Sequence, residues 1–484
     1  AQFNLGLMYS TGRGVAKDDE ETVKWYRMAA EQGDAMAQWG LGFKYEMGEG
    51  VPKDDAEAVR WYRMAAEQGI AEAQLNLGHK YVTGVGVTND YVEAAKWLRM
   101  AAEQEDAKAQ CFLGKMYDSG WGVAKDDAEA VKWYRLAAEQ GNAMAQWGLG
   151  FKYETGKGLA KDDEEALKWY RLAADQGLDW AQNNLGRMYA NGKGVPVDYG
   201  EAVKWYRMSA EQGYDQAQFN LGLMYAKGEG VPKDATEAVR WYRLAAEQGD
   251  VDAQFNLGLM YDNGEGVPKN AVEAIKWYYL AAEQGDASAQ NNLGVMYAKG
   301  EGVPKDDAEA LKWYRMAAEQ GHAGAQYYLG WKYLTGEGVP KDDMEAAKWF
   351  RMAAVQGNPS AQYNLGVMYV NGEGMPEDDV EAVKWYRLAA AQGNAKAQCY
   401  LGAMYANGEG VHRDIEEAIK WYRMAADQGE VDAQCYLGFI YATGNGVPED
   451  NAEAAKWYRL AAEQGNPSAQ YNLGLMYDNL EGFP

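Results

Sequence analysis

Residue types that commonly carry catalysis or metal binding are sparse in this chain of 484 residues. The three histidines, His79, His322 and His412, share no spacing, so they predict neither a metal triad nor a Ser–His or Cys–His pair. The pattern Gly12-x-Gly14 follows a predicted helix rather than a strand and lacks a third glycine, which argues against a dinucleotide-binding fingerprint. The sequence therefore predicts no catalytic residues, no metal site, no cofactor and no enzyme.

A 36-residue period dominates the sequence. The pair Ala-Gln recurs from Ala1-Gln2 to Ala469-Gln470, fourteen times without an insertion or deletion. Positions in each repeat are counted from this alanine, so residues 1–36 are positions 1–36 of the first repeat. A fixed period of this length is typical of a solenoid, in which one repeat alone cannot bury its apolar face. We expect a single domain over residues 1–484, with thirteen full repeats and a terminal helix.

Each repeat is expected to contain two helices. Positions 1–10 form helix A, because Ala1, Leu5 and Met8 follow helical spacing, and glycines at positions 12 and 14 end it. Helix B starts at position 18 and runs to a stop glycine at position 33, after which an Asp or Asn often begins the next helix A. Position 18 is Asp in every repeat except for Asn270, and Glu follows three residues later, as in a capping box. The predicted fold class is all-α.

Helical-wheel geometry assigns faces to both helices. On helix B, positions 22, 23, 25, 26, 28, 29 and 30 form a wide apolar arc, so we expect these side chains, including the tryptophan at position 25, to be buried. On the polar strip, ion pairs are expected between positions 20 and 24 and between positions 27 and 31. The glycine at position 6 of helix A indicates a crossing too close for a methyl group, with the alanines of positions 29 and 30 facing it.

These fixed positions carry a family resemblance. The string Ala-Gln-x-x-Leu-Gly-x-Met-Tyr-x-x-Gly-x-Gly-Val-x-x-Asp-x-x-Glu-Ala-x-x-Trp-Tyr-x-x-Ala-Ala-x-x-Gly, read over residues 217–249, closely resembles the Sel-one-like repeat (SLR) of the tetratricopeptide-like α-solenoids. The resemblance covers the whole chain and implies a right-handed superhelix of antiparallel helix pairs, with helix A on the concave side. It also implies a scaffold for other proteins, often in bacterial envelope signalling, host interaction or membrane-associated protein degradation. A secreted or periplasmic location is favoured by this resemblance alone. One branch of the family has a cysteine pair in each repeat, which this sequence lacks, so a role specific to that branch is not expected.

The variable positions 3, 4, 7, 10 and 11 of helix A form an arc of about 120° opposite the fixed face. This arc is rich in aromatic side chains, which act as anchors at interaction surfaces. The candidate partner-binding residues are Phe3, Trp39, Phe43, Phe112, Trp147, Phe151, Phe219, Phe255, Tyr327, Tyr328, Trp331, Tyr363, Tyr400, Tyr436 and Tyr471. At position 3 an alternative stays open, since these rings could instead tuck between adjacent helices A and belong to the core. The identical segments 39–46 and 147–154 are expected to repeat a Trp/Phe/Lys patch on the surface.

Composition narrows the classes of partner. The chain has 47 basic and 72 acidic residues and a net charge of −25, which would repel nucleic acids and anionic membrane surfaces. The simpler interpretation, and the one that we favour, is that the acidic surplus only keeps a long repeat array in solution. No apolar run of about 18 residues occurs, so no membrane insertion is expected.

Two sets of residues depart from the usual expectations. Glu105 replaces the position-33 glycine, and a left-handed conformation there would cost roughly 1 kcal/mol or more unless the helix packing changes locally. Cys111, Cys399 and Cys435 all occupy position 3, so the last two lie on successive helices A. That separation exceeds the limit of roughly 7 Å between the α-carbons of a disulfide, and free thiols are expected.

Two functional hypotheses follow. The first is a non-enzymatic scaffold or adaptor that binds a peptide or protein partner on the concave helix-A surface. The alternative is a structural subunit that self-associates end to end, because the last helix A has no partner and Leu480 and Phe483 leave an apolar terminus. Excision from a longer protein would explain the same ends.

Overall fold

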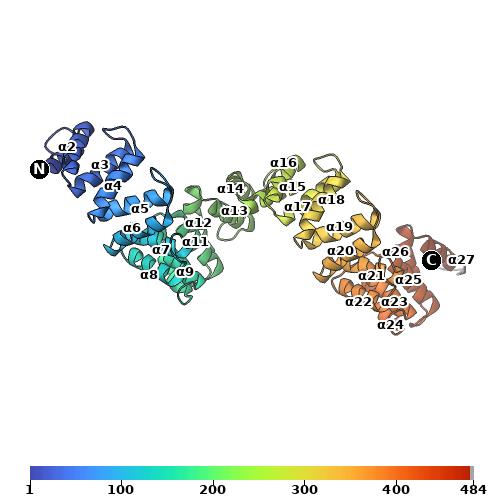
Figure 1. Ribbon diagram of the computed structural model, residues 1–484. Coiled ribbons are helices and arrows are strands. Elements are labelled where there is room, and N and C mark those ends of the chain that lie inside the picture. Colours follow the sequence, from blue (N-terminus) through green and yellow to red (C-terminus); the bar gives the residue numbers. More distant parts are fainter. Residues whose placement is uncertain (480–484) are drawn as a thin grey trace. The chain divides into compact units, whose positions relative to one another are not determined.

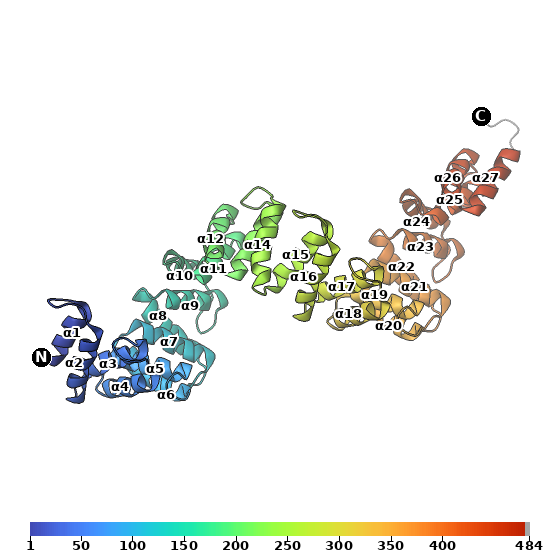
Figure 2. The same cartoon turned by 90° about the horizontal axis from the view of Figure 1, so that it is seen from above.

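The computed structural model describes residues 1–479, which fall into two units, residues 1–250 and residues 251–479. Each unit is a row of paired helices (Figure 1), and the view turned by 90° shows the same alternation of helices within each unit (Figure 2). The described residues form 27 helices and no strand. The predicted all-α solenoid is thus confirmed.

Seven helices A and seven helices B make up the first unit. Its helices A are α1 (Gln2–Thr11), α3 (Ala35–Met47), α5 (Ala71–Thr83), α7 (Ala107–Ser119), α9 (Ala143–Thr155), α11 (Asp179–Asn191) and α13 (Asp215–Lys227). Its helices B are α2 (Asp19–Glu31), α4 (Asp55–Glu67), α6 (Tyr91–Glu103), α8 (Asp127–Glu139), α10 (Asp163–Asp175), α12 (Tyr199–Glu211) and α14 (Ala235–Glu247).

The second unit, which begins at residue 251, continues the same alternation. Its helices A are α15 (Val251–Asn263), α17 (Ala287–Lys299), α19 (Ala323–Thr335), α21 (Pro359–Asn371), α23 (Ala395–Asn407), α25 (Val431–Thr443) and α27 (Pro467–Asn479). Its helices B are α16 (Ala271–Glu283), α18 (Asp307–Glu319), α20 (Asp343–Val355), α22 (Asp379–Ala391), α24 (Ile415–Asp427) and α26 (Asn451–Glu463).

Side-chain caps define where the helices begin. The Asp54 carboxylate accepts hydrogen bonds from the amides of Ala56 and Glu57 at 3.0 Å, which confirms the predicted start of helix B. Helix A begins at position 35 of the preceding repeat, directly after the Asp or Asn expected to begin it, and so extends beyond the apolar pattern of positions 1–10. In α3 this start is capped, since the Asp34 carboxylate accepts from the Ala37 amide at 2.9 Å, whereas α5, α11, α13 and α25 begin at the same position without a side-chain cap.

The glycine at position 6 allows the two helices of a repeat to cross closely. A β-carbon on Gly42 would lie 2.8 Å from the ring of Tyr62, and one on Gly294 would lie 2.6 Å from the ring of Tyr314. The close crossing is therefore confirmed. The facing group was predicted wrongly, because the aromatic side chain at position 26, and not the alanines of positions 29 and 30, stands over the glycine.

The glutamine at position 2 joins consecutive repeats. Gln38 is buried, and its amide donates to the Ala30 carbonyl on the preceding helix B at 3.1 Å. Its side-chain oxygen accepts from the Gln68 amide on the following helix B at 2.7 Å. Equivalent bonds recur in both units, for example at Gln362 with Ala354 and Gln392. The position-1 alanine beside this glutamine is fully buried in the interior repeats, so the Ala-Gln pair marks the interface between repeats.

The core of helix B is close to the predicted arc, with one correction. Tryptophan at position 25 is buried in most repeats, as expected, and half-buried at Trp25, Trp169, Trp385 and Trp421. Position 28 was wrongly assigned to the core, since side chains such as Leu388 at this position are exposed. The neighbouring helices cover positions 25, 26, 29 and 30, while position 28 lies at the solvent-facing edge of the arc.

Charged pairs on helix B also differ from the prediction. Lys24 pairs with Glu21 at 2.7 Å, so the spacing is i,i+3 and not the expected pairing of positions 20 and 24. Arg27 donates to the hydroxyl of Tyr45 on the next helix A at 2.7 Å instead of pairing with position 31. Lys24 pairs with the capping-box residue Glu21 because this carboxylate is the nearer one. Arg27 extends across the repeat boundary because the Tyr45 hydroxyl there accepts its hydrogen bond.

Glu105 adopts the left-handed conformation, with φ of 66°. It is the one non-glycine residue with positive φ among the described residues, and glycines at the same position have φ between 87° and 100°. The β-carbon of a residue at Gly69 or Gly141 would meet nothing within 4 Å. The strain at Glu105 therefore lies in its backbone and not in steric contact with neighbours.

Alanine substitutions at two position-6 glycines test the crossing. Gly294→Ala forces the Tyr314 ring to move, so we expect a loss of about 1–3 kcal/mol in the free energy of unfolding, as for other overpacked sites. Gly474→Ala in α27 is the matched control, because a β-carbon there meets nothing within 4 Å. It should stabilise its helix by about 0.5–1 kcal/mol. Local hydrogen exchange measures both, and equal effects at the two sites would contradict the proposed origin of the glycine.

The backbone strain at Glu105 is also testable. Glu105→Gly should raise the local free energy of unfolding by about 1 kcal/mol, because glycine adopts positive φ without a steric penalty. The reverse change at an open site, Gly141→Glu, should lower it by a similar amount. Urea denaturation combined with hydrogen exchange of the adjoining helices checks both values, and a destabilised Glu105→Gly variant would refute the assignment.

Candidate functional site

The aromatic side chains at position 3 are half-buried in most repeats. Their rings lie over the position-26 ring of the same repeat, with centroid distances of 5.7 Å for Phe219–Tyr242 and 6.1 Å for Tyr363–Tyr386. Neither alternative for position 3 therefore holds fully, since one face of the ring packs on the core and the other side stays partly accessible. Phe3, Trp39, Trp147, Phe219, Phe255, Tyr327 and Tyr363 are half-buried, whereas Tyr471 is exposed.

Most aromatic side chains at positions 4 and 7 are more exposed to solvent than those at position 3. The ring of Tyr436 is stacked on Tyr422 of the preceding helix B at 5.2 Å, and that of Tyr328 is stacked on Tyr314 at 5.1 Å. Each of these position-4 rings is thus supported by a buried tyrosine while a large part of it faces solvent. Tyr328, Tyr400, Tyr436, Phe43 and Trp331 are exposed, and Phe112 and Phe151 are half-buried.

Two further aromatic residues belong to this surface. Phe439 is 51% exposed and occupies position 7, so the criterion that selected the other residues could have identified it. Trp180 is exposed and its ring lies 5.5 Å from that of Trp147. It precedes the Ala-Gln pair and lies in the first turn of α11, outside the arc of variable positions from which the candidates were chosen. We call the partly exposed aromatic side chains of helices A, including these two, the aromatic face.

The lysines of the repeated Trp/Phe/Lys segments are not on the surface. Lys152 is fully buried and pairs with Asp118 at 2.5 Å and with Asp127 at 2.6 Å. Lys44 is also buried and pairs with Asp19 and Glu49 at 2.6 and 2.7 Å. The predicted surface patch was therefore wrong in its lysines, because position 8 points inward, where the ammonium group meets a carboxylate at the start of the preceding helix B and a second carboxylate nearby.

Another charged cluster surrounds Glu154 at the boundary between two repeats. Its carboxylate accepts from Arg187 at 2.7 Å and from the Tyr170 hydroxyl at 3.0 Å. Burial alone would raise the pKa of Glu154, but the hydrogen bond and charge of Arg187 hold it below its usual value. Its partners come from the same repeat and the next one, so the cluster links two repeats, although Arg187 occupies the variable position 7.

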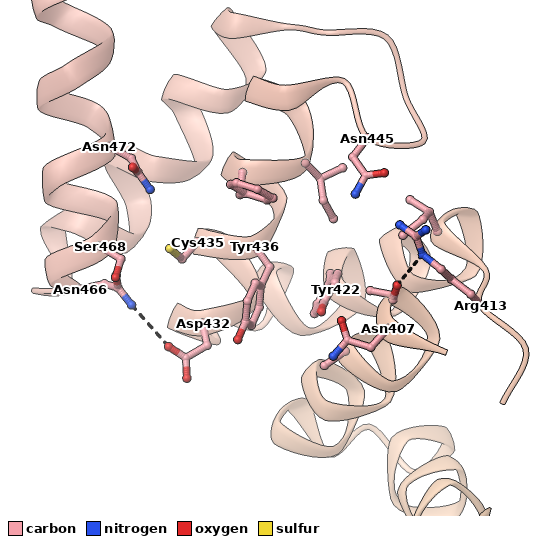
Figure 3. A pocket seen from close by; sticks show the side chains of 15 residues that line it. Asn407, Arg413, Tyr422, Asp432, Cys435, Tyr436, Asn445, Asn466, Ser468 and Asn472 are labelled. Carbon is pink, nitrogen blue, oxygen red and sulfur yellow. Dashed lines mark hydrogen bonds between the residues drawn. The ribbon is translucent and has the colours of Figure 1, made fainter. Parts of the chain in front are cut away.

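A pocket opens between α23, α25 and α27, and we call it the α23–α27 pocket (Figure 3). Its volume is about 520 Å³. The close-up shows Cys435 and Tyr436 on the central helix, between Asn466 and Asn472 on one side and Asn407 on the other (Figure 3). The full lining is Ala403, Ala406, Asn407, Arg413, Ile415, Tyr422, Asp432, Cys435, Tyr436, Phe439, Ile440, Asn445, Asn466, Ser468 and Asn472.

The same crevice recurs in the first unit. A smaller pocket of about 310 Å³ lies between α11 and α13 and is lined by Arg187, Leu223 and Asn220 among others. Both pockets use positions 7, 10, 11, 19 and 26 of one repeat and positions 4, 7 and 8 of the next. The crevice is therefore a property of the repeat, and the side chains that vary at these positions determine its size and polarity.

The cysteines are poorly suited to nucleophilic chemistry. All three are free thiols, as predicted, and burial raises the pKa of Cys111 to about 11 and that of Cys399 to about 12. Burial also raises the pKa of Cys435 in the pocket. Within residues 1–479, no group of three or more His, Cys, Asp or Glu side chains could hold a metal ion. No helix in this range is long and apolar enough to span a bilayer.

Comparison with known proteins accounts for this architecture. The family model described as "Sel1 repeat" matches residues 1–34, 35–70, 71–106, 107–142, 143–178, 181–214, 215–250, 251–286, 287–322, 323–358, 359–394, 395–430, 431–466 and 467–484. No curated relative matches the chain in sequence. The chain belongs to the Sel1 repeat family, as its sequence resemblance implied.

Two solved structures are similar at the level of sequence and fold. The crystal structure of c5321, a protective antigen present in uropathogenic Escherichia coli strains and displaying an SLR fold, is 37% identical over 94% of both chains, with a TM-score of 0.76. The crystal structure of a Sel1 repeat protein from Oxalobacter formigenes is also 37% identical. That match covers 68% of this chain and 93% of the other, with a TM-score of 0.51.

The ion pairs of the buried lysines make the stability of the fold depend on pH. The hydrogen bond from Lys332 lowers the pKa of Asp307, so this carboxylate contributes stability above its unfolded pKa of about 3.9. The contribution is lost as the pH falls through the lowered folded value. Lys332→Met, which installs the residue found at this position in Met296 and Met368, should therefore lose less stability between about pH 5 and pH 2.

A pH series of urea denaturation curves measures this dependence. Lys341→Met is the control, because Lys341 is largely exposed in its pair with Asp343 and should leave the acid dependence nearly unchanged. Identical pH profiles for the Lys332→Met variant and the parent would contradict the role of the buried pair.

Proposed function

We propose that this protein is a non-enzymatic scaffold that binds a peptide or protein partner on its aromatic face. The observation that supports this is the series of partly exposed aromatic rings on helices A, each held by a buried framework. Aromatic side chains are enriched at the energetic centres of protein interfaces, and rings already fixed by packing lose little conformational freedom on binding. We take residues 1–484 as one solenoid domain, because the 36-residue spacing continues across Asp250 and Val251.

The class of partner follows from charge and chemistry. The net charge of −25 disfavours nucleic acid and favours a partner with basic groups. Membrane insertion and a cofactor form no part of the proposal. A secreted or periplasmic location is part of the proposal and rests on the family resemblance. The similar protein c5321, a bacterial antigen, is consistent with it.

Panning a random peptide library on the whole chain tests the aromatic face. We expect selected peptides to bind at least about tenfold more weakly to one of three alanine pairs, which is the effect of losing one or two interface anchors. The pairs are Trp39→Ala with Phe43→Ala, Tyr328→Ala with Trp331→Ala, and Tyr436→Ala with Phe439→Ala. Fluorescence polarisation of the labelled peptides measures the change.

The control variant is Met316→Ala on helix B. Met316 and Tyr328 are each 38% exposed, so the two sites differ in face and not in accessibility. Peptides that lose affinity with Met316→Ala, and with none of the three pairs, would place the binding surface on helices B and refute the proposal.

End-to-end self-association is the alternative function. Leu480 and Phe483, on which it partly rests, lie outside the described residues. On α27 the side chains of Tyr471, Leu475 and Tyr477 are exposed, which supplies an apolar surface for a second copy. Sedimentation velocity over a range of concentrations, with Leu475→Glu as the variant, distinguishes this function from partner binding by a monomer.

A further inference from the structure

The α23–α27 pocket is lined at position 7 of α23 by an alanine. Some helices A carry a large ring at this position, as in Phe43, Phe151 and Trp331, whereas α23 has Ala403, with Ala406 one turn further on. The pocket beside these two small side chains has a volume of about 520 Å³. We propose that this pocket holds one large apolar side chain of an extended peptide segment, with a lysine or arginine of the same segment beside Asp432. This inference rests on the proposed function and names a binding subsite for it.

The walls of the pocket fit an apolar side chain. Ile415 and Ile440 line it, together with Phe439 and the ring of Tyr436. Tyr436 is fixed by stacking on Tyr422 at 5.2 Å, so one wall is ordered before any ligand arrives. The pocket therefore combines an apolar wall with polar side chains, as sites that orient a bound ligand group do.

Polar side chains surround these walls and fit the backbone of an extended segment. Asn407, Asn445, Asn466 and Asn472 all line the pocket, and they approach it from both sides (Figure 3). Each side-chain amide can donate and accept, which matches the alternating N–H and C=O groups of an extended peptide. A small apolar molecule would leave most of these groups without a role.

The charge of Asp432 at the pocket favours a ligand that carries a basic residue beside its apolar side chain. Asp432 is exposed and accepts from the Asn466 side-chain amide at a long 3.4 Å, so its carboxylate retains acceptor capacity. The one basic side chain in the lining, Arg413, donates instead to the Ala406 carbonyl at 2.9 Å. A cationic group on the ligand is therefore attracted to Asp432, and the overall charge of −25 acts in the same direction.

Filling the pocket provides the sharpest test. Ala403→Phe places at this position a residue that the repeat already carries at Phe43 and Phe439, so the fold should tolerate it. Val295→Phe on α17 is the matched control, because it makes a similar change at the same repeat position away from the pocket. Circular dichroism and thermal unfolding establish that both variants fold.

The probe is a random hexapeptide library panned on the whole chain, followed by labelled peptides from the enriched clones. We expect a large apolar residue within two positions of Lys or Arg. Binding should weaken at least tenfold with Ala403→Phe and, separately, with Asp432→Asn, and it should stay unchanged with Val295→Phe. Bound peptide should also slow alkylation of Cys435 by N-ethylmaleimide, since this thiol lines the pocket.

The outcomes separate this inference from the proposed function. Peptides that are unaffected by Ala403→Phe and Asp432→Asn but depend on Tyr328 and Trp331 overturn the pocket and leave the scaffold proposal standing. Peptides affected by no variant of helix A overturn both. Selection of apolar peptides without a basic residue, still sensitive to Ala403→Phe, overturns the assigned role of Asp432.

Discussion

The glutamine at position 2 carries the interaction on which the rest of this structure depends. Its side-chain amide donates a hydrogen bond to the last turn of one helix B, as Gln38 does to the Ala30 carbonyl. Its side-chain oxygen accepts one from the glutamine that caps the next helix B, here Gln68. Loss of the position-2 glutamine would remove two hydrogen bonds, at about 0.5–1.5 kcal/mol each, since the Ala30 carbonyl keeps the Gly33 amide and Gln68 keeps the Met64 carbonyl. A solenoid has only nearest-neighbour interfaces, so each of these bridges supports the next repeat in the row.

The contacts that hold the repeats together come from the fixed positions of the repeat, so the other positions are free to vary. Position 6 must be small because the position-26 ring lies over it, and position 1 must be small because it is fully buried. Positions 3, 4 and 7 lie beyond these contacts, and aromatic residues accumulate there. Their rings rest on position-26 tyrosines such as Tyr242 and Tyr422, so the same side chain that completes the core also supports the surface.

Most of the framework could be predicted from the sequence because its determinants are local. Capping residues, stop glycines and the 36-residue period act within one repeat, and each is visible in the order of residues. The buried lysines could not be found this way, since Lys44 meets Asp19 only where two repeats pack together. Position 28 was misassigned for a related reason: a helical wheel shows which residues share a face, but not how far the neighbouring helix extends over it. The α23–α27 pocket likewise depends on which side chains from three helices A meet, and residues such as Ala403 give no signal by themselves.

The crevice between repeats shows how one framework can support different sites. At position 8, Lys332 forms a buried ion pair with Asp307, while Ile440 contributes an apolar wall to its crevice. At position 7, the ring of Trp331 is exposed to solvent, while the small side chain of Ala403 lines the α23–α27 pocket. Both choices are compatible with the same helix crossing, because neither position contacts the glycine or the glutamine that hold the repeat together. In the scaffold that we propose, specificity arises from the side chains that occupy positions 7 and 8 along otherwise equivalent crevices, while the fixed positions keep the same fold.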